Sequence, residues 1–375
     1  MDFTLSDDQR AFAETAASVF ADYCSDEALR AFEHSGAPFM QPLWTQCVAT
    51  GLHSIVVGAD EGGLGLGMTE LMGVLEAQGR ALAPVPLWGQ QLGLAALARF
   101  GTPALRELVV GPALAGDALL AVTLHTPLRA TRAASGWRLD GRVPAVPLGG
   151  QAAWLLAAVE VQGATRLALI DPVRAGVRRD EGLSQHHLAV ADVVFDGVTL
   201  GAEQLLAPPA MAWLEPRAIA SLAALQLGVT AQQLARTVEY VSSRRQFERP
   251  IGSFQLVAGE MADGHIALET LRSSLWQLVY RLDAGLGALP QALATRVLAC
   301  DTGHRVGHMA QHVHGGIGVD LSYPIHRYLY WSRALGTALG GADQHLARLG
   351  DWLADHDTLG WKYDLAEQDS DHAPV

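Results

Sequence analysis

Apolar and polar positions follow a helical spacing over residues 1 to about 117. Ser6 precedes the first helical stretch, and its side chain can accept hydrogen bonds from backbone N–H groups two or three residues further on. A longer stretch, Thr69–Ala83, carries apolar residues on one side of a helix and stops at Pro84. The pattern predicts an N-terminal helical domain over residues 1–117.

A different pattern begins after Gly116. Short segments that are β-branched or alternate apolar and polar residues are separated by glycine, aspartate and proline, which is typical of strands. These segments are Leu119–Leu124, Gly136–Val146, Ala152–Val161, Thr165–Ile170 and Ala189–Val198. The dipeptides Asp140-Gly141 and Asp196-Gly197 are typical of tight turns. We expect a small β domain over residues 118–205.

Helical spacing returns from about Pro208. Four long helices are predicted: Met211–Ser242, Phe254–Leu282, Pro290–His314 and Tyr328–Asp355, the last interrupted by Gly340-Gly341. They would form a C-terminal four-helix bundle over residues 206–360, followed by an acidic tail over residues 361–375. The predicted fold class is therefore α+β, with a helical domain, a β domain and a helical bundle in that order.

Composition and charge narrow the possible partners. Half of the 375 residues are apolar and 17% are charged, which suits a large interior or surface hidden in an oligomer. A net charge of −13 argues against nucleic acid, because phosphate binding needs a basic face. The uncharged run Ala218–Ala235 is too polar for a membrane span, and the acidic N-terminus does not resemble a signal peptide. With three scattered cysteines, we expect a cytoplasmic protein that binds neither membrane nor nucleic acid.

The segment Ser242–Gln255 concentrates the candidate chemistry of the chain. It places the adjacent arginines Arg244 and Arg245, the aromatic Phe247 and an Arg-Pro turn beside a long apolar helix. Guanidinium groups pair bidentately with phosphate, so the arginine pair predicts an anionic ligand. The segment is interpreted as a loop that grips the pyrophosphate and adenosine end of a dinucleotide. The alternative is an ordinary helix–helix loop with surface arginines.

The domain order and several motifs resemble those of the acyl-CoA dehydrogenase family, over nearly the whole chain. The motifs are Trp44 with Gly51-Leu52, Glu61-Gly62-Gly63-Leu64-Gly65, Trp137–Arg142, Arg244–Phe247 with Pro250-Ile251-Gly252 and Phe254-Gln255, and His314–Val319 with Tyr323–Arg327. Each motif alone is a weak match, but their order along the chain is specific.

The resemblance implies FAD as cofactor and oxidation of an acyl-CoA thioester to the 2,3-enoyl-CoA. It also implies a homo- or hetero-tetramer and an electron-transfer flavoprotein as acceptor. In this family the loop and a Gly-Gly turn contact FAD held largely by the neighbouring subunit. The matching residues are Arg244, Phe247, Gln255, Gly315 and Gly316, and His312, at the position of a family Gln, can still donate one hydrogen bond.

The catalytic base of the family has no clear counterpart in this chain. The reaction needs a carboxylate beside the flavin, and the two family positions for it fall on Leu339 and Ala218. Glu215 lies one helical turn before Ala218 and is the weak candidate for the base, although a carboxylate near a helix start also interacts with the helix dipole. Asp343 is weaker still.

The β domain departs from the family pattern as well. The acidic and Gly-Ser parts of the family's flavin-side motif are absent around Thr123–Pro127, and Pro144 and Pro147 cannot donate backbone hydrogen bonds to a flavin ring. The residues on the adenosine side of the site thus match the family motifs, while those on the flavin side depart from them. This asymmetry resembles bacterial heterotetramers acting on steroid side-chain thioesters, in which one subunit type carries the base and the other lends the loop.

Three alternatives concern a metal site and the role of the chain. His304, His308 and His312 share one helix face and paired histidines can bind zinc, but no HExxH motif accompanies them, so no metal is predicted. The chain could instead be a non-catalytic subunit that completes the FAD site of a base-bearing partner, or a stand-alone protein that binds a CoA ester without flavin.

Overall fold

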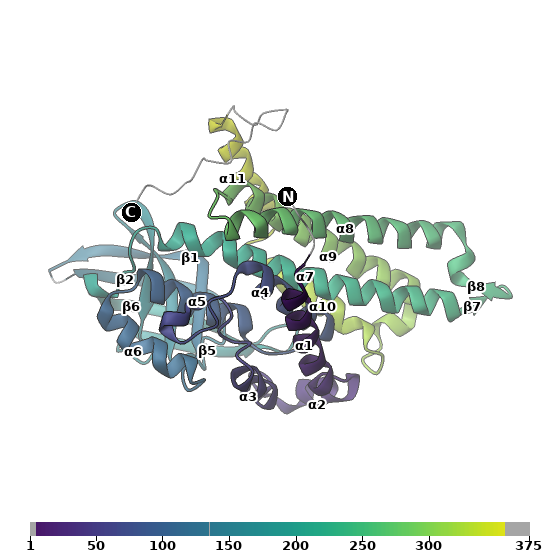
Figure 1. Ribbon diagram of the computed structural model, residues 1–375, viewed down its shortest axis with the longest axis horizontal. Coiled ribbons are helices and arrows are strands. Elements are labelled where there is room, and N and C mark those ends of the chain that lie inside the picture. Colours follow the sequence, from purple (N-terminus) through teal and green to yellow (C-terminus); the bar gives the residue numbers. More distant parts are fainter. Residues whose placement is uncertain (1–4, 135, 357–375) are drawn as a thin grey trace. The chain divides into compact units, whose positions relative to one another are not determined.

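The computed structural model describes residues 5–134 and 136–356, which form two compact units (Figure 1). The unit that we call the helical unit consists of Met1–Ala28, Met68–Ala83 and Ile219–Val375, within those described limits. The unit that we call the β unit consists of Leu29–Gly67 and Pro84–Ala218. Each unit is therefore assembled from separate stretches of the chain. The domain boundaries at 117 and 205 stay predictions, and the tail 361–375 lies outside the described residues.

Long helices build the helical unit. Its described helices are α1 (Asp7–Tyr23), α4 (Met68–Ala81), most of α7 (Ala210–Ser243), α8 (Gln255–Asp283), α9 (Leu289–His314), α10 (Ile325–Thr337) and α11 (Ala342–Asp355). Helix α9 packs against α8, α10 and α11. The backbones of α4 and α7 come very close, since a Cβ atom on Gly228 would lie 2.0 Å from the carbonyl oxygen of Glu76. Only glycine fits at this crossing.

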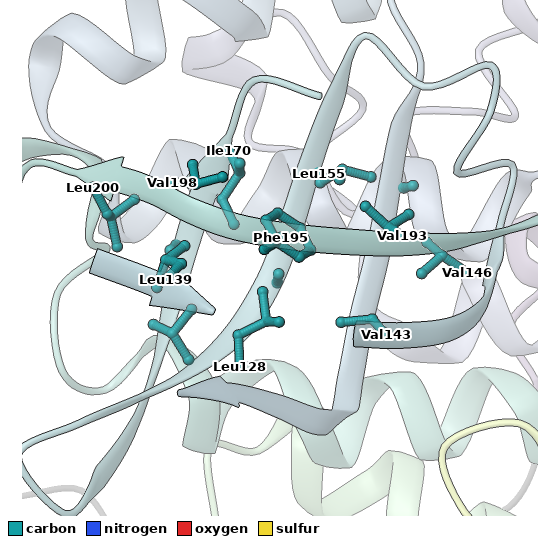
Figure 2. Packing of buried hydrophobic residues seen from close by; sticks show 14 of the residues in the cluster. Leu128, Leu139, Val143, Val146, Leu155, Ile170, Val193, Phe195, Val198 and Leu200 are labelled. Atoms are coloured by element: carbon teal, nitrogen blue, oxygen red, sulfur yellow. The ribbon is translucent and has the colours of Figure 1, made fainter. Parts of the chain in front are cut away.

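A six-stranded sheet is the centre of the β unit. The strands are β1 (Leu120–Ala133), β2 (Gly136–Pro147), β3 (Trp154–Val161), β4 (Ala164–Ile170), β5 (Val177–Leu183) and β6 (Ala189–Leu200). Their order is β4-β3-β1-β2-β6-β5, and β1 and β3 run parallel while the other neighbours are antiparallel. Figure 2 shows Phe195 among Leu128, Leu139 and Leu155 in the apolar core of this sheet. The apolar alternation of the strands thus builds one buried face.

Helices complete the β unit. They are α3 (Gln41–Ala49), α5 (Leu87–Phe100), α6 (Pro103–Leu114), part of α2 (Asp26–Ser35) and the start of α7. The buried Gln90 on α5 joins this layer to the sheet, because its amide donates to the carbonyl of Ala118 at 3.0 Å and its Oε1 accepts from the N–H of Leu120 at 2.8 Å. A buried amide satisfied on both sides fixes where β1 begins.

Helix positions in the C-terminal half were predicted closely. The observed bounds of α7, α8 and α9 lie within one residue of the expected ones. The expected fourth helix is two helices, α10 and α11, separated at residues 338–341. Ser6 caps α1 as predicted, by accepting from the N–H of Gln9 at 3.1 Å. The uncharged run lies in α7, which could span a membrane by length and composition, but 89% of its most apolar window is buried.

The strands were predicted less well. Asp140-Gly141 and Asp196-Gly197 do not form hairpin turns; they lie inside β2 and β6, where the register shifts between Leu139 and Gly141. The two dipeptides meet across the sheet, since Asp140 Oδ1 accepts from the N–H of Gly197 at 2.9 Å. The glycine of an Asp-Gly pair can adopt a positive φ, which some β-bulges need just as tight turns do. Strand β5 was missed because its sequence, VRRDEGL, is mostly polar and exposed.

Candidate functional site: the hairpin and the Gly-Gly turn

The arginine-rich segment forms a small hairpin at the end of α7 (Figure 1). Strands β7 (Arg245–Gln246) and β8 (Arg249–Pro250) are joined by Phe247 and Glu248, whose φ angles are +50° and +64°. Two positive φ angles define the tight turn that glycine and asparagine usually fill, so phenylalanine and glutamate are strained here. The turn presents Phe247 outward, and 86% of its surface is exposed.

Contacts within the loop hold the hairpin against the start of α8. The ring of Phe254 meets Phe247 edge to face with 6.2 Å between centroids, and the Arg249 guanidinium lies 3.9 Å above the Phe254 ring. The N–H of Ile251 donates to the carbonyl of Arg244 at 2.8 Å. Gln255, the first residue of α8, follows directly. Among the described residues the exposed Arg244 guanidinium has no acidic partner, which leaves it available to an anion.

The Gly-Gly turn lies at the end of α9. Gly315 adopts φ +60° and ψ −136°, a conformation that only glycine takes without strain, and it begins the short helix η4 (Gly315–Val319). Apart from the adjoining residues and the backbone of the turn itself, no described heavy atom lies within 4 Å of the place where a Cβ would stand on Gly315 or Gly316. The backbone of the turn is therefore accessible to a ligand.

His312 stands beside this turn and is exposed over 75% of its side chain. Its Nδ1 lies 3.3 Å from Oε1 of Glu260 on the second turn of α8. The contact links α8, which starts at Gln255, to α9, which ends at His314. All six predicted cofactor-binding residues thus belong to the helical unit, on neighbouring helix ends.

Of three aromatic residues in this region, Tyr240 was missed by the sequence reasoning, and His314 and Tyr323 were named only as parts of motifs. The ring of His314 stacks on Tyr240 with 4.1 Å between centroids, and Tyr323 lies 5.6 Å from His314. His314 is the last residue of α9 and is buried, while Tyr240 precedes Arg244 by one helical turn. Their spacing along the chain gives no signal, because the contact joins helices more than 70 residues apart.

Neither family position for the base carries a carboxylate. Leu339 lies in the connection between α10 and α11 with φ +56°, and Ala218 is buried in α7. The buried Arg296 donates from one Nη to the carbonyls of Leu335 at 2.7 Å, Gly340 at 3.2 Å and Ala338, and Nε2 of His345 donates to the Leu339 carbonyl at 2.8 Å. Hydrogen bonds from Arg296 and His345 thus hold the connection that carries Leu339.

The carboxylate candidates are less favourable than the sequence indicated. Glu215 is the sixth residue of α7, with Pro216 inside the helix, so it does not lie at the helix start. It is half-buried, has an interaction of its own and belongs to the β unit. Asp343 is exposed in the first turn of α11, where a carboxylate stabilises the helix dipole.

The proline-rich stretch of the β unit uses its own backbone donors. The N–H of Ala145 donates to Asp192 Oδ1 at 2.7 Å, and the N–H of Leu148 donates to the carbonyl of Ala189 at 2.9 Å. The Ala145 N–H and the Arg142 guanidinium lower the pKa of Asp192, so this carboxylate stays charged and keeps its partners. With Pro144 and Pro147 lacking N–H groups, this stretch fits a flavin ring poorly.

The histidine stripe on α9 does not gather other ligands. His304 and His308 have ring centroids 4.4 Å apart, and burial followed by the neighbouring His304 lowers the pKa of His308. Within residues 5–134 and 136–356, no group of three His, Cys, Asp or Glu side chains is placed to hold a metal ion.

Comparison with known proteins decides the family. The description "Acyl-CoA dehydrogenase, N-terminal domain" matches residues 6–117, and "Acyl-CoA dehydrogenase, C-terminal domain" matches residues 216–354. FadE27, an acyl-CoA dehydrogenase of Mycobacterium tuberculosis, is 33% identical over 95% of this chain and 99% of its own length. The chain belongs to the acyl-CoA dehydrogenase family.

Solved structures of this family agree with that assignment. A chain of the ChsE4-ChsE5 complex from Mycobacterium tuberculosis superposes with a TM-score of 0.89 at 33% identity, covering 95% of this chain and 100% of its own. A chain of the Tcur3481-Tcur3483 steroid acyl-CoA dehydrogenase gives 0.88 at 35% identity, covering 94% and 99%. Butyryl-CoA dehydrogenase from Megasphaera elsdenii, at 22% identity and 0.83, shares the fold. The α+β fold predicted from the sequence is confirmed, and the family is one of flavin-linked oxidoreductases that act on CH–CH bonds.

Proposed function

We propose that this chain is a subunit of an FAD-dependent enzyme that oxidises an acyl-CoA to the 2,3-enoyl-CoA. The observation that supports this most is that Arg244, whose guanidinium has no acidic partner among the described residues, lies with an exposed Phe247 and an open Gly-Gly turn on the helical unit. This residue set suits a dinucleotide, since it offers a cation, an aromatic face and accessible backbone N–H groups.

Each residue of the site has a definite task in this proposal. Arg244 neutralises pyrophosphate, Phe247 packs against a ring, and the side chains of Gln255 and His312 supply hydrogen bonds. Gly315 and Gly316 let the backbone approach the cofactor, because a side chain at either position would intrude. When bound, FAD supplies the acceptor for the hydride that leaves the β carbon of the thioester.

A second function is favoured by the base positions. Leu339 and Ala218 cannot take a proton, and the backbone donors near Pro144 are used within the β unit. Such a chain suits a non-catalytic role in which its hairpin completes the FAD site of a base-bearing partner. The structures of the ChsE4-ChsE5 complex and of Tcur3481-Tcur3483 support a heteromer, although dehydrogenation within one family oligomer remains the primary proposal.

The remaining parts of the proposal concern surroundings rather than the site. The oligomer is a tetramer, the substrate an acyl-CoA with a bulky group such as a steroid side chain, and the acceptor an electron-transfer flavoprotein in the cytoplasm. The steroid proposal rests on the resemblance to the Tcur3481-Tcur3483 enzyme.

Expression alone and with a family member that carries a glutamate at the Leu339 position separates the two roles. Bound flavin and acyl-CoA turnover by this chain alone support the enzyme role, with Glu215→Gln then showing whether Glu215 is the base. Flavin that appears only on co-expression supports the partner role. Acyl-CoA binding without flavin in both preparations contradicts the proposal.

A further inference from the structure

The buried end of α9 is chemically unusual. His314 is 4% exposed, and its Nδ1 donates to the carbonyl of Ala310 at 2.7 Å, so Nε2 is the unprotonated nitrogen of the neutral ring. Nε2 is buried without a hydrogen-bond partner among the described residues. The ring is therefore held by one hydrogen bond and by its contacts with neighbouring rings.

Those ring contacts join two elements of the candidate site. His314 and Tyr240 stack with 18° between their planes and 4.1 Å between centroids. Tyr323 closes the cluster at 5.6 Å from His314 and 6.5 Å from Tyr240. The cluster therefore connects α7, the end of α9 and the segment that follows η4.

Each stacked ring is directly linked to one part of the proposed FAD-binding site, either the Arg244 hairpin or the Gly315-Gly316 turn. The carbonyl of Tyr240 accepts from the N–H of Arg244 at 2.8 Å, and Gly315 follows His314 in the chain. The contact between His312 and Glu260 lies nearby but is largely exposed, and exposed ion pairs contribute little rigidity. The stack of the buried His314 on the half-buried Tyr240 is thus a less exposed connection between the hairpin and the Gly-Gly turn.

We infer that His314 is a positioning residue, whose stack on Tyr240 holds the Gly315-Gly316 turn and the Arg244 hairpin in one fixed arrangement. The inference rests on the proposed function for its ligand, a dinucleotide that must meet the turn and the hairpin together. The mechanical link itself can be measured without any ligand. Aromatic pairs of this kind change an equilibrium by about three- to tenfold.

The test uses the variants H314A, H314F, Y240A and the double variant H314A/Y240A. Hydrogen exchange of the whole protein is measured at residues 244–254 and 315–319, together with the dissociation constant of FAD. The matched control is H356A, because His356 stacks on Trp352 with 4.0 Å between centroids but lies at the end of α11. H314F keeps an aromatic ring and removes both ring nitrogens.

H314A and Y240A should each speed exchange in both segments, and weaken FAD binding by about three- to tenfold. The double variant should be no worse than either single variant, H314F should restore both measurements, and H356A should change neither. An effect of H314A on residues 315–319 alone, or failure of H314F to restore, would overturn the inference. If the parent protein takes up no FAD in any assembly, the proposed function fails while the exchange data still decide the link.

Discussion

Leu339 shows how a single residue can carry strain at the site. Its φ of +56° is costly for a residue with a side chain, and the hydrogen bonds from Arg296 and His345 to the surrounding carbonyls keep it there. Leu339→Ala removes the side chain beyond Cβ, whereas Leu339→Gly removes Cβ as well, so only the glycine variant relieves the backbone. We expect the free energy of unfolding of the glycine variant to exceed that of the alanine variant by about 1 kcal/mol.

Denaturant unfolding of the two variants measures this difference. In an ordinary helix the order is reversed, since glycine is there less favourable than alanine by about 1 kcal/mol. Equal stabilities, or the ordinary order, would show that the connection between α10 and α11 is not strained.

His314 gives stability a dependence on pH. Burial lowers its pKa, and the hydrogen bond to the Ala310 carbonyl offsets this only in part. The unfolded chain then binds the proton more readily, so the contribution is complete above the ordinary histidine pKa of about 6.5 and is lost as the pH falls toward the folded value. H314F should therefore lose less stability than the parent protein between neutral and mildly acidic pH.

Unfolding free energies at both pH values check the sign. His53 and His186 also have pKa values lowered by burial, the latter to about 4, so the variant should keep part of the acid sensitivity. If the unfolding free energies of H314F and the parent protein change in parallel with pH, His314 does not contribute to the acid sensitivity.

At the scale of elements, the crossing of α4 and α7 decides whether the helical unit forms. Gly228→Ala would place a Cβ 2.0 Å from the carbonyl oxygen of Glu76 and 2.8 Å from the N of Arg80, so the two backbones must separate. We expect destabilisation by about 3 kcal/mol or more, in the range of severe overpacking.

Gly259→Ala in α8 is the matched control. No atom outside its own helix turn lies within 4 Å of the added Cβ, and the residue is exposed, so the variant should gain about 0.5–1 kcal/mol. Thermal unfolding compares the two. A neutral Gly228→Ala would mean that the crossing is looser than the backbone distances indicate.

An element can be predicted from the sequence when its own residues carry the pattern that forms it, and not when contacts with distant segments form it. Helices α7, α8 and α9 carry long apolar stripes and were predicted within one residue. Strand β5 has no apolar stripe. It forms through backbone hydrogen bonds to β6, which any sequence can provide, so its own residues give no signal. The Asp-Gly pairs of β2 and β6 meet across the sheet, where Asp140 accepts from the N–H of Gly197, and a local turn rule cannot anticipate such a tertiary contact.

At the scale of the whole molecule, some residues of the candidate site can be recognised from local motifs, and others only from the folded structure. Arg244, Phe247, Gly315 and Gly316 form motifs that a single sequence reveals. The stack of His314 on Tyr240 and the fastening of the Leu339 connection by Arg296 depend on packing between distant helices. The base stays unassigned, since Glu215 remains only a prediction and no family position for the base holds a carboxylate.

The central claim is that this chain supplies the adenosine-side grip on FAD, and flavin content tests it most directly. Arg244→Gln removes a guanidinium that has no acidic partner among residues 5–134 and 136–356, whereas the control Arg305→Gln removes an exposed arginine of α9 that pairs with Asp301 at 2.8 Å. Charge-assisted hydrogen bonds are worth about 1.5–3 kcal/mol, so Arg244→Gln should weaken FAD binding by about tenfold or more in the assembled oligomer, and the control should not. Equal flavin content and affinity in Arg244→Gln and the parent protein would contradict the account.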